Sequence, residues 1–267
     1  MLMADLGDIR LHYRDDGLAD GVPLVFANSL GTDLRLWDQL LARLPAGFRV
    51  IRYDKRGHGL SDAPPGRYAM GALVRDLERL LDHLGVREAV LVGLSIGGMI
   101  AQGLAVKRPD MVRALVLSNT GFKIGTRAMW EERIAAVEKG GIEALADAVM
   151  ARWFPPSFRA TPECAGWRHM LCRTPARGYA GCCAAIAGTD MTTPTSGLRL
   201  PVLGIAGSED GATPPDLVRE TLALIPGSRM VLIRHAGHLP CVDQPLAYAE
   251  AINAFLTECG VSAREDS

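Results

Sequence analysis

The fold of this chain is decided by residues 90–99, which read VLVGLSIGGM. An apolar strand runs into a Gly-x-Ser-x-Gly turn, and an apolar, helix-like segment follows. This is the pattern of a nucleophile elbow, in which a serine stands on a sharp turn between a strand and a helix. Gly93 and Gly97 have to be small, because a side chain on either would clash where the two elements meet. Ser95 is therefore the candidate nucleophile.

The candidate acid follows a later strand. Around such an elbow the acid and then the histidine come after the serine in the chain, each on a loop that follows a strand. The apolar strand predicted over residues 201–206 leads into a polar turn that contains Glu209 and Asp210. Asp210 also stands where it could cap the helix that Pro214 and Pro215 begin. We select Asp210 as the acid.

Two histidines follow the strand predicted over residues 230–233. His238 stands in a loop just before a proline, whereas His235 lies closer to the strand end, where we expect it to pack. We therefore select His238 as the general base, which would take the proton of the Ser95 hydroxyl and return it to the leaving group. Asp210 would hold the imidazole in the required tautomer and stabilise its cation.

The oxyanion of a tetrahedral intermediate needs backbone N–H donors. One is expected from the residue after the nucleophile, Ile96. The other is expected from the loop after an early strand, where residues 24–27 lead into residues 28–32 and Leu30 is the candidate. His58 stands in a glycine-rich turn and is interpreted as a buried structural residue.

The length and charge of the chain fit an enzyme built on one large α/β domain. Its 267 residues are enough to bury a large core. The formal net charge of −1 gives no reason to expect a nucleic acid or an anionic membrane as partner. The N-terminus lacks a basic flank with a long apolar run, and no segment reaches the roughly 18 to 20 apolar residues of a membrane span. We therefore expect a cytoplasmic protein.

The cysteines predict neither disulfides nor a metal site. None forms a Cys-x-x-Cys pair, and Cys182 and Cys183 lie in an apolar run, where free cysteine behaves as a small hydrophobe. No metal and no other cofactor is expected. The six cysteines are Cys164, Cys172, Cys182, Cys183, Cys241 and Cys259.

Strands alternate with amphipathic stretches along the chain, which predicts an α/β fold with a mostly parallel, twisted sheet and helices on both faces. A hairpin-like lead at residues 9–14 comes first, with a polar turn after it at residues 15–17. Residues 73–84 carry apolar side chains at helical spacing. The predicted strands cover residues 24–27, 49–53, 89–92, 114–118, 201–206 and 230–233.

Residues 122–194 contain no convincing strand and read as short helices separated by glycine and proline. Such a long interval inside a compact domain is typical of a lid. We predict a helical cap over Ser95, inserted between core segments 1–121 and 195–267. An arginine that faces the pocket beside a tryptophan would bind a small carboxylate-bearing substrate. The cap holds Trp130, Trp153 and Trp167, together with Arg127, Arg133, Arg152, Arg159, Arg168, Arg173 and Arg177.

These motifs together resemble the α/β-hydrolase superfamily, over the core on both sides of the predicted cap. The resemblance is carried by the elbow, Asp210, His238 and residues 53–61, YDKRGHGLS. Two further motifs resemble the 3-oxoadipate enol-lactonases of bacterial aromatic catabolism. They are residues 28–33, NSLGTD, with Trp37-Asp38, and residues 178–186, GYAGCCAAI. Many superfamily members have His-Gly where this chain has Asn28-Ser29, and that departure matches the enol-lactonases.

The resemblance implies the α/β-hydrolase fold and a serine hydrolase of the β-ketoadipate pathway. The length of 267 residues suggests a stand-alone enzyme. Ser95, Asp210 and His238 would open the ring of a small lactone that carries a carboxylate. Arg133 is the first candidate for binding that carboxylate, because it lies three residues after Trp130 and would share its helix face. Trp130 and Trp153 are further candidate contacts.

Other functions are compatible with the same residues. A general carboxylesterase or another lactonase would use the same triad and differ in its cap contacts. A cofactor-free perhydrolase also uses serine, aspartate and histidine, and a non-catalytic protein of this fold would hold a ligand without turnover. Dehalogenases of this fold use a carboxylate nucleophile, so Ser95 argues against them.

Overall fold

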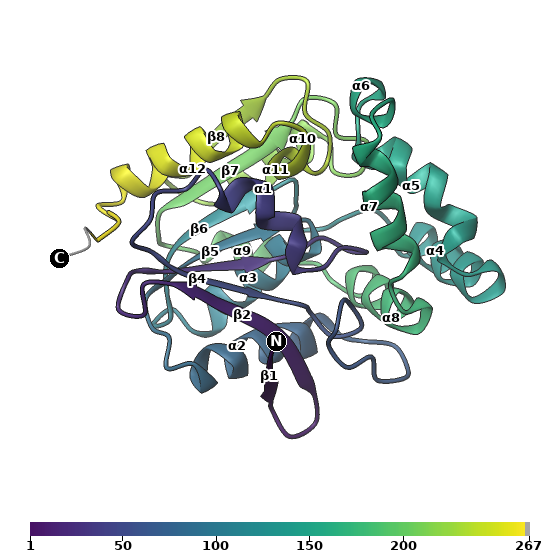
Figure 1. Cartoon of the computed structure of the whole chain (residues 1–267), viewed down its shortest axis with the longest axis horizontal. Coiled ribbons are helices and arrows are strands. Elements are labelled where there is room, and N and C mark those ends of the chain that lie inside the picture. The colour runs from purple at the N-terminus through teal and green to yellow at the C-terminus, as the bar shows by residue number, and fades with distance from the viewer. Residues whose placement is uncertain (265–267) are drawn as a thin grey trace.

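The computed structural model describes residues 1–264, which form an eight-stranded sheet with helices on both faces (Figure 1). The strand order is β1-β2-β4-β3-β5-β6-β7-β8, and every pair from β4 to β8 is parallel. The predicted fold class is therefore confirmed. The strands are β1 (Leu2–Asp5), β2 (Arg10–Gly17), β3 (Pro23–Ala27), β4 (Arg49–Tyr53), β5 (Ala89–Leu94), β6 (Val112–Ser118), β7 (Val202–Gly207) and β8 (Arg229–Ile233).

The central strands are buried because helices cover the sheet on both sides. β5 and β7 are buried along their whole length, as a parallel strand between two helical layers has to be. Figure 1 shows α12 (Pro245–Glu258) and α1 (Asp38–Leu41) along one side of the sheet and α2 (Met70–His83) along the other. α2 contains most of the helix predicted over residues 73–84. It buries its predicted apolar stripe and packs on α3 (Ile96–Lys107).

The N-terminal hairpin differs from the prediction. The polar residues 15–17 do not form its turn, because β2 continues to Gly17 and pairs with β4. Asp15 and Asp16 stay in the strand because Arg49 and Arg52 of β4 pair with their carboxylates, at 2.6 and 3.1 Å. The turn lies earlier, where β2 follows β1, a strand that the sequence patterns did not predict.

The described chain between β6 and β7 is helical, and Figure 1 shows most of these helices grouped at one end of the sheet. α4 packs on α8, and α5 packs on α7. The boundaries 122–194 of the cap stay a prediction, since α9 runs across residue 194 and packs on α3. The helices are α4 (Arg127–Gly140), the 3₁₀ helix η2 (Ile142–Leu145), α5 (Ala146–Trp153), α6 (Pro156–Arg159), α7 (Glu163–Cys172), α8 (Ala176–Ala187) and α9 (Thr192–Ser196).

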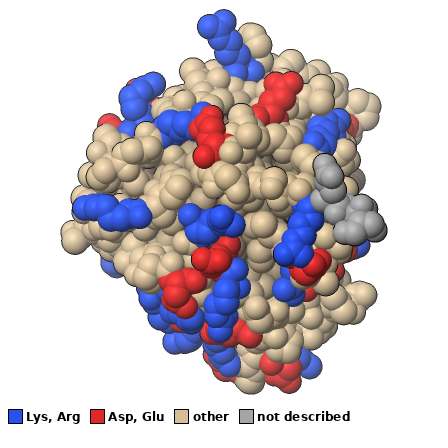
Figure 2. Space-filling view, turned by 90° about the vertical axis from the view of Figure 1, so that its left-hand side faces the viewer, with Lys and Arg blue, Asp and Glu red and all other residues tan. Residues whose placement is uncertain are grey.

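Acidic and basic side chains lie side by side on the face shown in Figure 2. Within residues 1–264, no helix combines the length and the apolar character needed to cross a membrane. The shorter elements that complete the described fold are the 3₁₀ helix η1 (Leu34–Trp37), α10 (Pro215–Ala223) and α11 (Pro240–Asp243).

Candidate active site

Ser95 stands on a sharp turn between β5 and α3. Its φ of 58° and ψ of −119° place a non-glycine residue in a region that L-residues rarely adopt. The turn is fixed by neighbours, since Ser95 N donates to Ser118 O at 3.0 Å and the Thr120 hydroxyl donates to Ser95 O at 2.6 Å. A Cβ at Gly97 would overlap the carbonyl of Ala27. The Gly-x-Ser-x-Gly pattern therefore forms the sharp turn between strand and helix that the absence of a side chain at Gly97 permits.

His238 and Asp210 are brought together at the carboxyl ends of β8 and β7. His238 Nδ1 lies 2.9 Å from Asp210 Oδ2, and both side chains are buried. Asn119 Nδ2 and the Thr213 hydroxyl also donate to Oδ2, at 2.8 and 2.7 Å, while the backbone N–H groups of Ala212 and Thr213 donate to Oδ1. Burial opposes ionisation of Asp210, but the charge of His238 and these donors outweigh it and lower its pKa.

The remaining imidazole nitrogen is available for proton transfer. Because Nδ1 faces a carboxylate, we assign the imidazole hydrogen to it, which leaves Nε2 as the basic atom. Nε2 of His238 lies 3.5 Å from the hydroxyl of Ser29 and shares a pocket with Ser95. No residue within 1–264 forms a hydrogen bond with Ser95 Oγ. The pocket between core and cap has a volume of about 30 Å³, so a ring-sized substrate can enter only when lining side chains move.

Leu30 and Ile96 have the backbone groups that an oxyanion hole requires. Leu30 N finds no acceptor within the described residues, although its loop neighbours Gly31 and Thr32 both donate hydrogen bonds. Ile96 opens α3, and the first N–H of a helix has no intrahelical acceptor. Leu30 lines the same pocket as Ser95. Within the described chain, two donors without an acceptor therefore lie beside the candidate nucleophile.

The three cap residues selected from the sequence, Trp130, Arg133 and Trp153, all line this pocket. The guanidinium of Arg133 lies over the Trp130 ring, 5.2 Å from its centroid, which is the pairing expected from their spacing. Nη1 of Arg133 donates to the Tyr179 hydroxyl at 3.4 Å.

A second arginine, Arg152, lines the pocket beside Arg133. Its Nε donates to the carbonyl of Gly211 at 3.2 Å. Burial and then the nearby charge of Arg133 lower the pKa of Arg152, but a guanidinium stays protonated at neutral pH. Within the described chain, neither arginine forms an ion pair with a carboxylate. The pocket therefore holds two positive charges without a direct carboxylate partner in the described chain, although Asp210 lies near enough to favour the charged form of Arg152.

The cap is bonded to the loops that carry the acid and the histidine. At the end of α5, Trp153 O accepts a hydrogen bond from His238 N at 2.7 Å, and Arg152 O accepts one from Gly211 N at 3.2 Å. These backbone bonds place the Trp153 ring and the Arg152 guanidinium beside the reacting groups.

Several site features differ from the sequence reasoning or were missed by it. His235 does not pack at the strand end; its side chain is 84% exposed, because β8 ends before it and the chain turns outward with a positive φ. Asn119, Ser29 and Arg152 were not selected. Asn119 follows predicted strand 114–118, and polar residues at the carboxyl ends of parallel strands are a usable signal for such a site. His58 is fully buried, as predicted.

The described residues provide no evident metal centre. All six cysteines are free thiols. Within residues 1–264, His, Cys, Asp and Glu side chains do not gather in groups of three or more that could hold a metal ion.

Comparisons with known proteins agree with this geometry. The sequence model described as the alpha/beta hydrolase family matches residues 24–251. A 3-oxoadipate enol-lactonase from Acinetobacter baylyi is 36% identical over 93% of this chain and 94% of its own length. The crystal structure of the enol-lactonase from Burkholderia xenovorans has a TM-score of 0.93 at 36% identity, over 96% of this chain and all of that one.

A hydrolase from Pseudomonas aeruginosa is a further structural relative. Its crystal structure has a TM-score of 0.91 at 40% identity and covers 96% of this chain and 97% of its own. The resemblance to enol-lactonases that the motifs carried is confirmed by these relatives. The chain belongs to the α/β hydrolase family.

Proposed function

We propose that this chain hydrolyses 3-oxoadipate enol-lactone to 3-oxoadipate in the β-ketoadipate pathway, with Ser95, His238 and Asp210 as its catalytic residues. The observation that carries the proposal is the composition of one pocket. A serine on an elbow and the base of an Asp-His pair lie there beside two arginines that form no ion pair with a carboxylate within residues 1–264. Similarity to the enol-lactonases of Acinetobacter baylyi and Burkholderia xenovorans supports this choice of substrate.

Acylation follows from the arrangement of the pocket. The Ser95 oxygen attacks the lactone carbonyl while Nε2 of His238 takes the hydroxyl proton. The N–H groups of Leu30 and Ile96 stabilise the resulting oxyanion. When the intermediate collapses, the ring C–O bond breaks and leaves an enolate. His238 returns its proton to the oxygen of that enolate, and the resulting enol tautomerises to a ketone, which no longer re-closes readily.

Deacylation uses the same groups, with water as the nucleophile and the Ser95 oxygen as the leaving group. Nε2 of His238 takes a proton from a water molecule, whose oxygen attacks the acyl carbon on Ser95. Collapse of this second intermediate breaks the bond to the serine oxygen, which takes back the proton from the imidazole. The product leaves with a new carboxylate. Asp210 keeps the imidazole oriented throughout, and its five hydrogen bonds hold it in place.

The arginines select the substrate in this proposal. The enol-lactone carries a carboxylate at neutral pH, and a guanidinium can bind it through two parallel hydrogen bonds. Arg133 enters from α4 and Arg152 from α5, so the two can approach one carboxylate from different helices of the cap. The tryptophans beside them supply apolar surface for the ring.

The test is the loss of ultraviolet absorbance of 3-oxoadipate enol-lactone with purified protein. Ser95→Ala and a panel of simple esters and saturated lactones are measured beside it. We expect fast loss that requires Ser95 and greatly exceeds the panel rates. Turnover of panel esters with the enol-lactone ignored would replace the proposal with a general carboxylesterase. Peroxide-dependent products would favour a perhydrolase, and no turnover of any compound would favour a ligand-binding protein.

A further inference from the structure

Lys55 is a buried cation directly behind the candidate oxyanion loop. Only 2% of its surface is exposed, and its Nζ donates to the carbonyl oxygen of Ser29 at 2.6 Å and more weakly to that of Thr32 at 3.4 Å. It forms no ion pair with any carboxylate in the described part of the chain. A buried ammonium is costly unless hydrogen bonds offset its lost hydration. Here the principal acceptor is one backbone carbonyl.

That carbonyl belongs to the peptide whose N–H is the proposed oxyanion donor, Leu30 N–H. The C=O of Ser29 and the N–H of Leu30 are the two ends of one planar, delocalised amide. A cation bonded to the oxygen draws electron density from the nitrogen and strengthens the N–H as a donor, because hydrogen bonds in a chain polarise one another. The effect is largest in a buried site, where water does not screen the charge.

We propose that Lys55 is a positioning residue that orients and polarises the Ser29–Leu30 peptide, so that Leu30 N–H becomes a stronger donor to the oxyanion. This rests on the proposed function, because it requires an oxyanion at Leu30. Lys55 touches no substrate and acts through the peptide. Its contribution is therefore made in the transition state and not in substrate binding.

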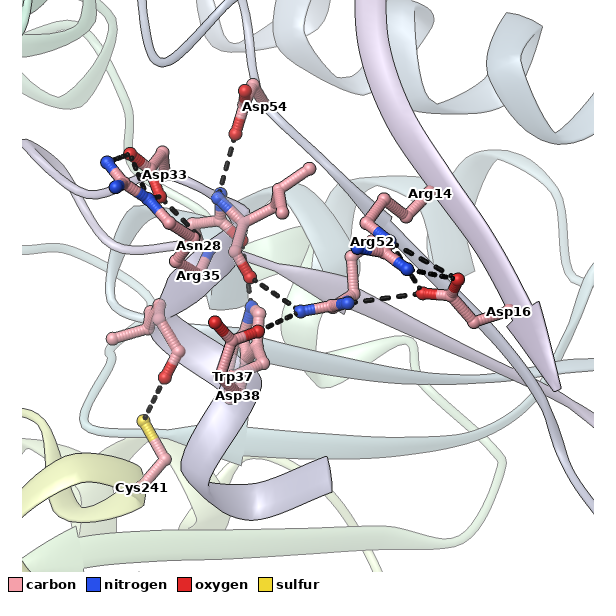
Figure 3. A network of polar contacts seen from close by, with 12 residues as sticks. Arg14, Asp16, Asn28, Asp33, Arg35, Trp37, Asp38, Arg52, Asp54 and Cys241 are labelled. Atoms are coloured by element: carbon pink, nitrogen blue, oxygen red, sulfur yellow. Dashed lines mark hydrogen bonds and ion pairs between the residues drawn. The ribbon is translucent and has the colours of Figure 1, made fainter. Parts of the chain in front are cut away.

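Other contacts hold the loop when the charge of Lys55 is removed. The Thr32 hydroxyl also donates to Ser29 O, at 2.9 Å, and Gly31 N donates to Nε2 of His58, at 2.9 Å. Figure 3 shows the flank of the loop, where Trp37 Nε1 donates to Asn28 and Leu34 N donates to a carboxylate oxygen of Asp54, both at 2.8 Å. The path of the loop is thus secured by neutral and acidic partners, and Lys55 adds the positive charge.

The charge of Lys55 gives this role a pH signature. Burial lowers the pKa of Lys55 to about 8, despite Cys182 of α8, Asp54 and Asp33, which favour the charged form. His58, a further titratable neighbour, is neutral in this range because burial holds its pKa well below the usual value. Burial also raises the pKa of Cys182 to about 12. Loss of a proton near pH 8 in this cluster therefore belongs to Lys55.

The experiment compares Lys55→Met with the wild type and with Lys123→Met, an exposed lysine paired with Asp190. We expect kcat of Lys55→Met on the enol-lactone to fall about tenfold with KM unchanged, which is less than the about 100-fold cost of deleting an oxyanion donor outright. Wild-type kcat should decline as pH rises through about 8. Lys55→Met should lack that decline, and Lys123→Met should match the wild type.

A boronic acid inhibitor supplies a second readout, because its tetrahedral adduct on Ser95 places an oxygen in the hole. Its inhibition constant should rise in Lys55→Met by the same factor as kcat falls, with binding of the product 3-oxoadipate unchanged. Thr32→Val, which removes a neutral donor from the same carbonyl, should keep the wild-type pH profile.

Unchanged kcat in folded Lys55→Met, or the same alkaline decline in both proteins, would overturn the role of Lys55. If that variant does not fold, a wild-type kcat that stays flat from pH 7 to 9.5 would overturn it. Failure of the proposed function looks different, because Ser95→Ala would then retain activity or the enol-lactone would not be turned over. An inactive Ser95→Ala beside an unaffected Lys55→Met refutes only the inference.

Discussion

Arg152→Ala tests whether the pocket recognises a carboxylate. The guanidinium has five N–H donors, and one of them, on Nε, is used by the Gly211 carbonyl. A hydrogen bond to a charged group contributes about 1.5 to 3 kcal/mol. Because Arg152 is only half-buried, we take the lower half of that range, and about 1.4 kcal/mol corresponds to a factor of ten. The expected loss in kcat/KM on the enol-lactone is therefore about 10- to 40-fold, mostly through KM.

The assay compares a substrate that carries a carboxylate with one that does not. Arg152→Ala is measured on the enol-lactone and on a neutral aryl acetate, which uses the same triad but offers the arginine no anion. We expect the loss on the enol-lactone only, and a smaller loss in Arg152→Lys, which keeps the charge without the planar fork. The matched control is Arg168→Ala, a cap arginine that pairs with Asp147. It should leave both rates unchanged.

Two results would refute this reasoning. A loss of equal size on both substrates would mean that Arg152 acts through the Gly211 loop and the catalytic acid beyond it, and not through an anion. An unchanged KM for the enol-lactone would remove Arg152 from the binding site. The same two assays on Arg133→Ala test whether Arg133, which the sequence predicts from its spacing to Trp130, also binds the carboxylate.

Three further changes have defined outcomes. Asn119→Ala removes a donor from Asp210 and should lower kcat several-fold with a loss of about 1 kcal/mol in unfolding free energy; an unchanged kcat would place Asn119 outside the positioning of the acid. Gly97→Ala should lower the unfolding free energy by about 1 to 3 kcal/mol, or should fail to fold. The control is Gly71→Ala, whose added methyl meets nothing within 4 Å and which should match or exceed wild-type stability in urea titrations. Lys55 keeps its proton up to about pH 10.5 in the unfolded chain but releases it near pH 8 in the native state. The unfolding free energy of the wild type should therefore rise relative to that of Lys55→Met as pH increases from about 8 to 10.5. A fall in this difference would contradict the lowered pKa.

The parts of this site that the sequence predicts are those fixed by local sterics. The elbow depends on Gly93, Ser95 and Gly97. These residues lie within one five-residue segment, so the geometry of the elbow follows from a short pattern. The positions of Asp210 and His238 follow almost as directly, because each comes just after a strand whose carboxyl end lies at the same edge of the sheet.

The parts that could not be predicted depend on how the cap packs. Composition alone does not decide which of the seven cap arginines binds the substrate carboxylate. The spacing of apolar residues along a helix does not show which of its turns faces the pocket. Arg133 was chosen through its local relation to Trp130, and that relation holds in the structure. Arg152 reaches the pocket only because the end of α5 is bonded to the His238 and Gly211 loops, which are distant in sequence. The prediction for His235 was wrong for a different reason, since its exposure follows from the end of β8 before it and from its positive φ.

Substrate recognition and catalysis share backbone in this molecule. The carbonyl of Arg152 accepts from the loop that holds the acid, and the next carbonyl, of Trp153, accepts from the N–H of His238 itself. Two consecutive carbonyl groups at the end of α5 bond to the Gly211 loop and to the His238 loop. A shift of α5 that moved the Arg152 guanidinium would therefore also move both loops. Anion binding in the cap and the orientation of the imidazole are therefore mechanically linked. This predicts that side-chain truncations in the cap change mainly KM, whereas changes that distort the end of α5 lower kcat as well.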